Sequence, residues 1–168
     1  MTNSSSALLD GTSYPDRMDL HRQAVALVRR RLIKQGLHST THKRLPVKAG
    51  PGDLLVEGKV WVAVRAATPG AKRKVIICPR GGKRYEYAYK LVFFNLASHN
   101  RRRMPPHVWA LVRMDTHRVY VLPQNTVGTK GLTVALVANP LRMRSHGRSW
   151  VYRGEERWQV VREAVAAA

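Results

Sequence analysis

The stretch Gly52-Asp53-Leu54-Leu55-Val56-Glu57-Gly58-Lys59-Val60-Trp61-Val62-Ala63-Val64-Arg65-Ala66-Ala67 decides the fold of this 168-residue chain. It holds two β-rich runs, 54–56 and 60–64, on either side of the turn signal at 57–59. Two short β-rich runs joined by a glycine-containing turn predict a β-hairpin. Glycine and proline at 50–52 break the chain just before the first run, so Asp53 stands where that strand opens.

The segments around this hairpin predict one helix before it and mostly strands after it. Apolar residues over 16–35 recur at spacings of three and four, which indicates an amphipathic helix closed by Gly36. Further β-rich runs predict strands over 75–78, 91–96, 108–114, 119–122 and 132–138, and 155–165 is typical of a closing helix. This order predicts an α/β fold of the α+β type, with a single central mixed β-sheet flanked by helices. We expect a flexible lead-in over 1–15 and one domain over 16–168.

Positive charge is the strongest compositional feature of the chain. It has 30 Lys and Arg residues against 10 Asp and Glu, which gives a formal net charge of +20. Such a charge on a folded protein predicts a polyanionic partner, and we expect nucleic acid, most of all duplex DNA. No membrane partner is expected, because the sequence has neither a long apolar run nor a basic amphipathic helix with aromatic anchors.

The basic residues gather in clusters that we expect to contact nucleic acid. One cluster falls in the first helix, one before and one after the run 75–78, one in the run 101–103, and one late in the chain beside His146. The residues expected to bind are Arg29, Arg30, Arg31, Lys72, Arg73, Lys74, Lys83, Arg84, Arg101, Arg102, Arg103, Arg142, Arg144 and Arg148.

The single cysteine and the polar N-terminus bear on the cellular compartment. Cys78 is the only cysteine, so no intramolecular disulfide can form, and a buried, inert thiol is the favoured interpretation. Residues 1–14 have neither a charged region nor an apolar core of the kind that signal peptides carry. We therefore expect the protein in the cytoplasm, with association with the nucleoid as an option.

The helix, the strand opened by Asp53 and the strand 60–66 together resemble the restriction-endonuclease-like PD-(D/E)XK superfamily. The resemblance runs from Asp19 to Leu122, and the stretch 152–158 is similar to the end of small intron-associated and phage-type members. It implies a helix packed on a mixed sheet, two acids that hold a divalent cation, and a lysine that orients the attacking water. Metal-assisted hydrolysis of a phosphodiester requires such carboxylates within a basic groove.

The superfamily's site pattern is only partly present in this chain. Asp53 matches the first acid and would be the metal ligand, but Ala63 stands where the second acid should be, and Arg65 where the lysine should be. Gln23 occupies the nearest plausible place for the glutamate that many members carry in the first helix. One carboxylate alone binds Mg²⁺ poorly. We therefore expect a DNA-binding protein with an incomplete metal site and no cofactor, which does not cleave DNA by itself.

Two alternatives remain open. The chain could be an active Mg²⁺-dependent DNA endonuclease whose second acid has moved, for example to Glu57 or Glu86. A literal match for this exists, because Asp53 is followed by Glu57 and Lys59, although Gly58 between them marks a hairpin tip. The second alternative is a basic structural protein associated with RNA or the ribosome, which the charge supports equally well. The sequence leaves the oligomeric state open, with a homodimer or a larger assembly among the options.

Histidines and tyrosines offer weaker signals. His38 and His42 would lie about 13 Å apart in an extended segment, so we do not expect a zinc site. Tyr85, Tyr87 and Tyr89 alternate with other residues, so their rings would face one side if this segment is extended. A row of core tyrosines is the favoured interpretation, and stacking on unpaired bases is the alternative.

Overall fold

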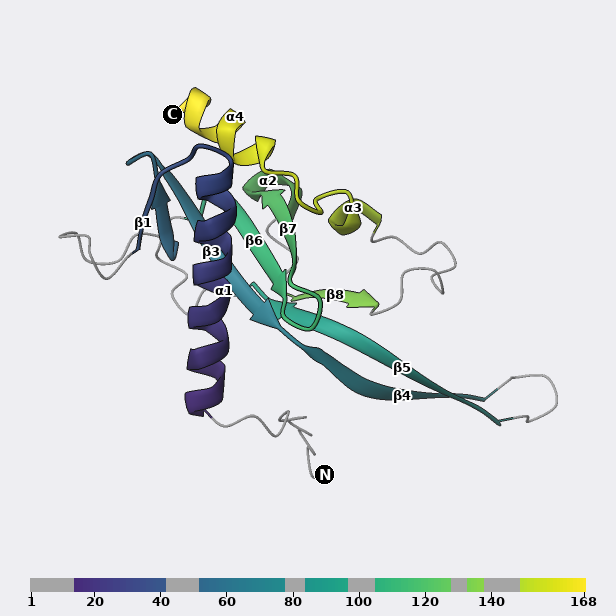
Figure 1. Ribbon diagram of the computed structural model, residues 1–168. Helices are drawn as coiled ribbons and strands as arrows, with labels where there is room; N and C mark the ends of the chain where they lie inside the picture. Colours follow the sequence, from purple (N-terminus) through teal and green to yellow (C-terminus); the bar gives the residue numbers. More distant parts are fainter. Residues whose placement is uncertain (1–13, 42–51, 78–83, 97–104, 128–132, 138–148) are drawn as a thin grey trace, which may run out of the picture.

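The computed structural model describes residues 14–41, 52–77, 84–96, 105–127, 133–137 and 149–168 (Figure 1). Its helices and strands follow one another in the order α1 (Tyr14–Lys34), β1 (Ser39–Thr41), β2 (Leu54–Val56), β3 (Val60–Ala67), β4 (Pro69–Ile77), β5 (Arg84–Asn95), β6 (Val108–Arg113), β7 (Arg118–Pro123), α2 (Gln124–Val127), β8 (Thr133–Val137), α3 (Ser149–Tyr152) and α4 (Gln159–Ala167). Of the predicted lead-in over 1–15, residues 1–13 lie outside the described residues, whereas Tyr14 and Pro15 already belong to α1.

A five-stranded mixed sheet forms the centre of the fold. Its strand order is β1-β2-β3-β6-β7, with β3 and β6 parallel and the other neighbours antiparallel. The predicted hairpin is present as β2 and β3, and Glu57 and Gly58 in its turn both have positive φ. The sheet flanked by helices confirms the predicted α+β class.

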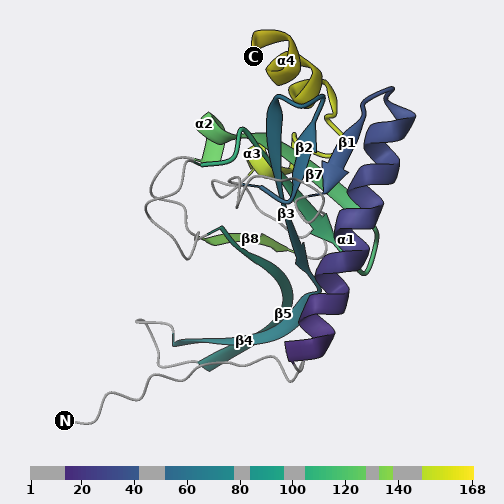
Figure 2. The same ribbon diagram turned by 90° about the vertical axis from the view of Figure 1, so that its left-hand side faces the viewer.

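One face of this sheet is covered by α1 and α4 (Figure 2). On α1, Ala24, Val28 and Leu32 are fully buried, and their spacing of four keeps them on one side of the helix. They pack into one apolar cluster with the strands and with Trp158 and Val161 at the C-terminus. The sequence pattern that predicted this helix is therefore the pattern of its buried side.

The opposite face is covered by the inner end of β5 and by α3. Val92 and Phe94 of β5 and Val151 of α3 join a second apolar cluster with Trp109 and Leu111 of the sheet. Strands of a sheet buried on both sides tend to be continuously apolar. Every residue of β6 is buried accordingly.

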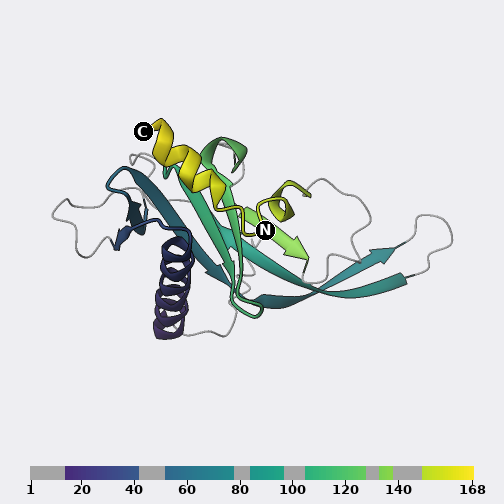
Figure 3. The ribbon, with the colours of Figure 1, turned by 45° about the horizontal axis from the view of Figure 1, so that its top comes forward.

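Strands β4, β5 and β8 form a separate three-stranded sheet, which the sequence did not predict. The β4–β5 ribbon pairs Pro69 with Val92 at its inner end and Ile77 with Arg84 at its outer end. It extends away from the five-stranded sheet (Figure 3). The strands predicted over 75–78 and 91–96 are parts of these longer strands, and Cys78 lies outside the described residues.

The closing helix begins later than predicted, at Gln159 instead of residue 155. Glu155 forms an isolated β-bridge with Tyr120, and the Glu156 N–H donates to the Val119 carbonyl at 2.8 Å. The backbone of 155–156 is thus engaged with β7 and is not free to turn into a helix. Within the described part of the chain, no helix is long and apolar enough to cross a membrane.

Candidate functional site

Asp53 lies at the mouth of the β2–β3 hairpin and is fixed by β3. Its backbone N–H donates to the Val62 carbonyl at 2.9 Å, and its Oδ2 accepts from the Val64 N–H at 2.6 Å. The chain can approach β3 this closely because residue 52 is glycine. A Cβ atom on Gly52 would lie 2.7 Å from the Val62 carbonyl oxygen, which real Cβ atoms essentially never do.

His21 of α1 is the helix residue that meets Asp53. Its Nε2 lies 2.9 Å from Asp53 Oδ1. The sequence-based choice of Gln23 for this place was wrong, because residues two apart point about 200° apart around a helix. Gln23 is exposed, whereas His21 precedes the buried Ala24 by three and Val28 by seven. That spacing is the signal by which the sequence could have revealed His21.

Arg65 of β3 completes the group. Its Nη1 lies 3.5 Å from Asp53 Oδ2 and donates to the Val64 carbonyl at 2.8 Å. The guanidinium carbon lies 5.1 Å from the centroid of the Trp109 ring, a distance at which a cation is attracted to the ring face. The structure therefore brings Asp53 and Arg65 together, as the sequence predicted, and adds His21.

The electrostatics of Asp53 favour its ionised form. Burial alone would raise the pKa of this carboxyl, but the hydrogen bond and charge of His21 oppose that effect. The Val64 N–H and the charge of Arg65 act in the same direction as His21, and together they hold the pKa of Asp53 below its ordinary value. Asp53 is thus ionised, and His21, the Val64 N–H and Arg65 are its partners.

Ala63, which stands at the position of the missing second acid, is surrounded by apolar side chains. Ala63 is 1% exposed and belongs to the apolar cluster that includes Phe94 and Trp109. A carboxylate there would have to leave water without a partner among these neighbours, which is costly. Among the described residues, no group of three or more His, Cys, Asp or Glu side chains could hold a metal ion.

The residues present do not fit a Mg²⁺ ion. Mg²⁺ prefers an octahedral shell of oxygen atoms and is usually held by one or two carboxylates with water and phosphate oxygens. Asp53 supplies the one carboxylate of this group, and its Oδ2 already has a guanidinium nitrogen 3.5 Å away, which repels a second cation. We therefore derive no reaction step through a metal at this site.

The other candidate acids lie apart from Asp53. Glu57 and Lys59 are exposed on the turn at the opposite end of β2, and a carboxylate oxygen of Glu57 accepts from the His38 N–H. Glu86 pairs with Val75 in the outer half of the β4–β5 ribbon. The structure brings none of these three side-chain positions to Asp53.

The structure describes only part of the predicted basic set. Arg29, Arg30 and Arg31 lie on α1, while Lys72, Arg73, Lys74 and Arg84 lie in the β4–β5 ribbon. Outside the described residues lie Lys83, Arg101, Arg102, Arg103, Arg142, Arg144 and Arg148. The ribbon's register pairs Lys72 with Tyr89 and Lys74 with Tyr87, so the backbone of the tyrosine run is extended.

The three arginines of α1 differ in their exposure and in their partners. The Nε atom of Arg29 is buried and has no hydrogen-bond partner among the described residues, while Arg30 is exposed. The Nη2 of Arg31 lies 3.8 Å from Glu156 Oε1, a carboxylate just before α4. Consecutive residues point about 100° apart around a helix, so the surroundings of the three arginines differ.

Comparison with known proteins shows a likeness of fold. A solved bacterial homing endonuclease, I-Ssp6803I, is similar with a TM-score of 0.58 and 18% sequence identity. The match covers 92% of this chain and 96% of that one. No protein-family model matches the chain, and no curated protein matches its sequence. The chain therefore has a nuclease-like fold.

Proposed function

From this nuclease-like fold, we propose that the chain is a duplex-DNA-binding protein of the restriction-endonuclease-like PD-(D/E)XK type with an incomplete metal site. We further propose that it does not cleave DNA by itself. The observation that carries the proposal is the pairing of Arg65 with Asp53 beside the buried Ala63. A cationic side chain thus stands beside the single acid, where a working nuclease needs a metal.

The chemistry of cleavage explains why this arrangement favours binding alone. Hydrolysis of a phosphodiester in this type of site depends on a metal that generates the nucleophile and stabilises the leaving oxygen. Asp53 supplies one carboxylate, and its two oxygens are already engaged by His21, the Val64 N–H and the nearby Arg65. Such a carboxylate is poorly placed to recruit a divalent cation.

The same group of residues suits a phosphate contact. A guanidinium has five N–H donors, and the one hydrogen bond of Arg65 described above leaves others for a phosphate oxygen. The Arg65 side chain is 31% exposed, so it can be reached from solvent. Because Asp53 is offset by Arg65, the site does not repel a phosphate as a lone carboxylate would.

Two further features support duplex DNA as the partner. The solved protein of similar fold is a homing endonuclease. The net charge of +20 favours an anionic partner. The β4–β5 ribbon is a two-stranded element of the kind that the major groove of B-DNA admits. We further propose a cytoplasmic location, with association with the nucleoid as an option.

The proposal is tested by fluorescence anisotropy of a labelled duplex in EDTA and in Mg²⁺, over about 50 to 200 mM salt. We expect binding in EDTA, and a log–log plot of affinity against salt that falls steeply and linearly. Unlabelled duplex should compete better than single-stranded DNA or RNA. A flat salt dependence would count against phosphate contacts, and stronger competition by RNA would favour the RNA-associated alternative.

A further inference from the structure

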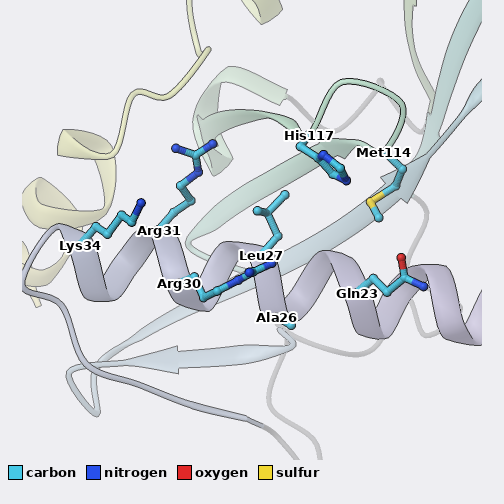
Figure 4. A pocket seen from close by; sticks show the side chains of 8 residues that line it. All are labelled: Gln23, Ala26, Leu27, Arg30, Arg31, Lys34, Met114 and His117. Carbon is cyan, nitrogen blue, oxygen red and sulfur yellow. The ribbon is translucent and has the colours of Figure 1, made fainter.

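A basic hollow of about 590 Å³ lies between α1 and the turn from β6 to β7 (Figure 4). Arg30, Arg31 and Lys34 line it from α1, and His117 lines it from the turn. Leu27 and Met114 supply its apolar part. Volumes of about 300 to 1,000 Å³ are typical of sites for small ligands.

This hollow is separate from the Asp53 group. Helix α1 packs over β3, which lies between β2 and β6 in the sheet. His21 and Asp53 meet on the β2 side of the helix, whereas Met114 and His117 approach it from the β6–β7 side. The two sites therefore occupy opposite flanks of α1.

Two acids that neighbour residues of the hollow, Glu156 and Asp115, are already engaged. Glu156 faces Arg31 and also accepts a hydrogen bond from Trp158 Nε1 at 2.7 Å. Asp115, in the same turn as His117, accepts two hydrogen bonds from Arg113, at 2.8 and 2.7 Å. None of the described residues that line the hollow is acidic.

Arg30 and Lys34, the cations of α1 that line the hollow besides Arg31, lie beside the apolar part of the hollow. Arg30 and Lys34 are four residues apart, so they lie on the same flank of α1, and both are exposed. Met114 lies in the turn between β6 and β7, belongs to the core cluster with 9% exposure, and lines the hollow. A ligand that fits has an anionic group for the two cations and an apolar or aromatic part for Leu27 and Met114.

We propose that this hollow binds a nucleotide, with the phosphate on Arg30 and Lys34 and the base against Leu27 and Met114. The nucleotide is either free or part of a nucleic-acid strand, since both present the same phosphate and base. The site is additional to the Asp53 group and does not depend on it.

The test uses the full chain with ¹³C-labelled methionine methyl groups, followed by NMR at about 150 mM salt. The probes are adenosine monophosphate, adenosine, inorganic phosphate and a short single-stranded DNA. The double variant R30Q/K34Q removes the two cations. The matched control R17Q/R22Q removes two arginines of the same helix that do not line the hollow, and the exposed Arg22–Asp19 pair it breaks is worth little.

We expect the monophosphate to shift the Met114 methyl signal and to bind more tightly than adenosine or phosphate alone. R30Q/K34Q should weaken its binding about tenfold, and the control should stay within about twofold of the wild type. If the single-stranded DNA binds more tightly than the monophosphate, the hollow takes a nucleotide of a nucleic-acid strand. If the monophosphate binds more tightly, the hollow takes a free nucleotide.

An unmoved Met114 signal with every probe would overturn the inference, as would equal binding by the two double variants. These failures are distinguishable from failure of the proposed function. If the protein binds duplex DNA but no probe shifts the Met114 signal, only the nucleotide site in the hollow is refuted. A protein whose hollow binds the monophosphate but which binds no duplex refutes the proposed function alone.

Discussion

Removing two cations from the β4–β5 ribbon, in the variant K72A/K74A, is expected to weaken duplex binding about 30-fold at 0.15 M salt. Each phosphate contact contributes about 0.9 to the salt slope, which corresponds to about 1 kcal/mol at this salt concentration. Two lost contacts should therefore also reduce the slope of log affinity against log salt by about 1.8. Anisotropy with the labelled duplex measures both quantities.

The physical basis is the register of the ribbon. Lys72 and Lys74 are two apart on β4, so their positions fall on one face, and they pair with Tyr89 and Tyr87 of β5. An extended ribbon with lysines at alternate positions of one strand can follow a phosphate backbone. The major groove, about 12 Å wide, admits such a two-stranded element.

The matched control is R153A/R157A, which removes the same charge from two exposed arginines between α3 and α4. We expect a loss of affinity below about threefold for this pair, because it acts only through the overall field. Equal losses for K72A/K74A and the control would mean that net charge, and not the ribbon, determines binding.

Substituting Asp53 by alanine should destabilise the fold by about 2 to 3 kcal/mol, the range for hydrogen bonds to a charged group in a partly buried site. The change removes the acceptor of the Val64 N–H and the partner of His21, and it leaves Arg65 without its carboxylate. Chemical denaturation measures the loss. D53N, which keeps one acceptor oxygen, should lose less.

The control for this prediction is D19A. Asp19 pairs with Arg22 at 2.6 Å, but both side chains are more than half exposed, so the pair contributes little. We expect a change below about 0.5 kcal/mol. A loss as large as that of D53A would show that any acid near α1 has the same effect, against a specific role for Asp53.

The contribution of Asp53 to the stability of the fold depends on pH. Because the pKa of Asp53 is lower in the folded protein, its stabilising effect is fully present above the unfolded value of about 3.9. The effect is lost as the pH falls through the folded pKa. The stability difference between wild type and D53N should therefore shrink below about pH 4. A difference that grows on acidification would contradict the assignment.

Local patterns in the sequence predicted the hairpin, α1 and the fold class, because each is set by residues close together in the chain. The length of β4 was missed, since Pro69 and Gly70 resemble a break. β4 is an edge strand of its sheet, and proline is tolerated on edge strands. The start of α4 was missed because Glu155 and Glu156 pair with β7, a contact between distant residues.

The candidate site was predictable in part for the same reason. Asp53, Ala63 and Arg65 were identified from the resemblance to the superfamily's pattern, which lies within one short stretch of the chain around the β2–β3 hairpin. His21 was missed although its spacing to Ala24 and Val28 places it near the buried side of α1, because the residue that it meets depends on how α1 lies over β3. The burial of Ala63 depends on β5, more than 25 residues further along the chain, and the hollow beside Lys34 depends on the β6–β7 turn.

The proposed function requires that the chain binds duplex DNA without a working metal site. The most direct test is incubation of the purified protein with supercoiled plasmid in Mg²⁺ or Mn²⁺, followed by electrophoresis, beside the D53A variant. We predict that the plasmid is retained in protein–DNA complexes yet recovered intact and supercoiled after the protein is removed. If the wild-type protein produces nicked or linear plasmid and the D53A variant does not, the proposed function is contradicted.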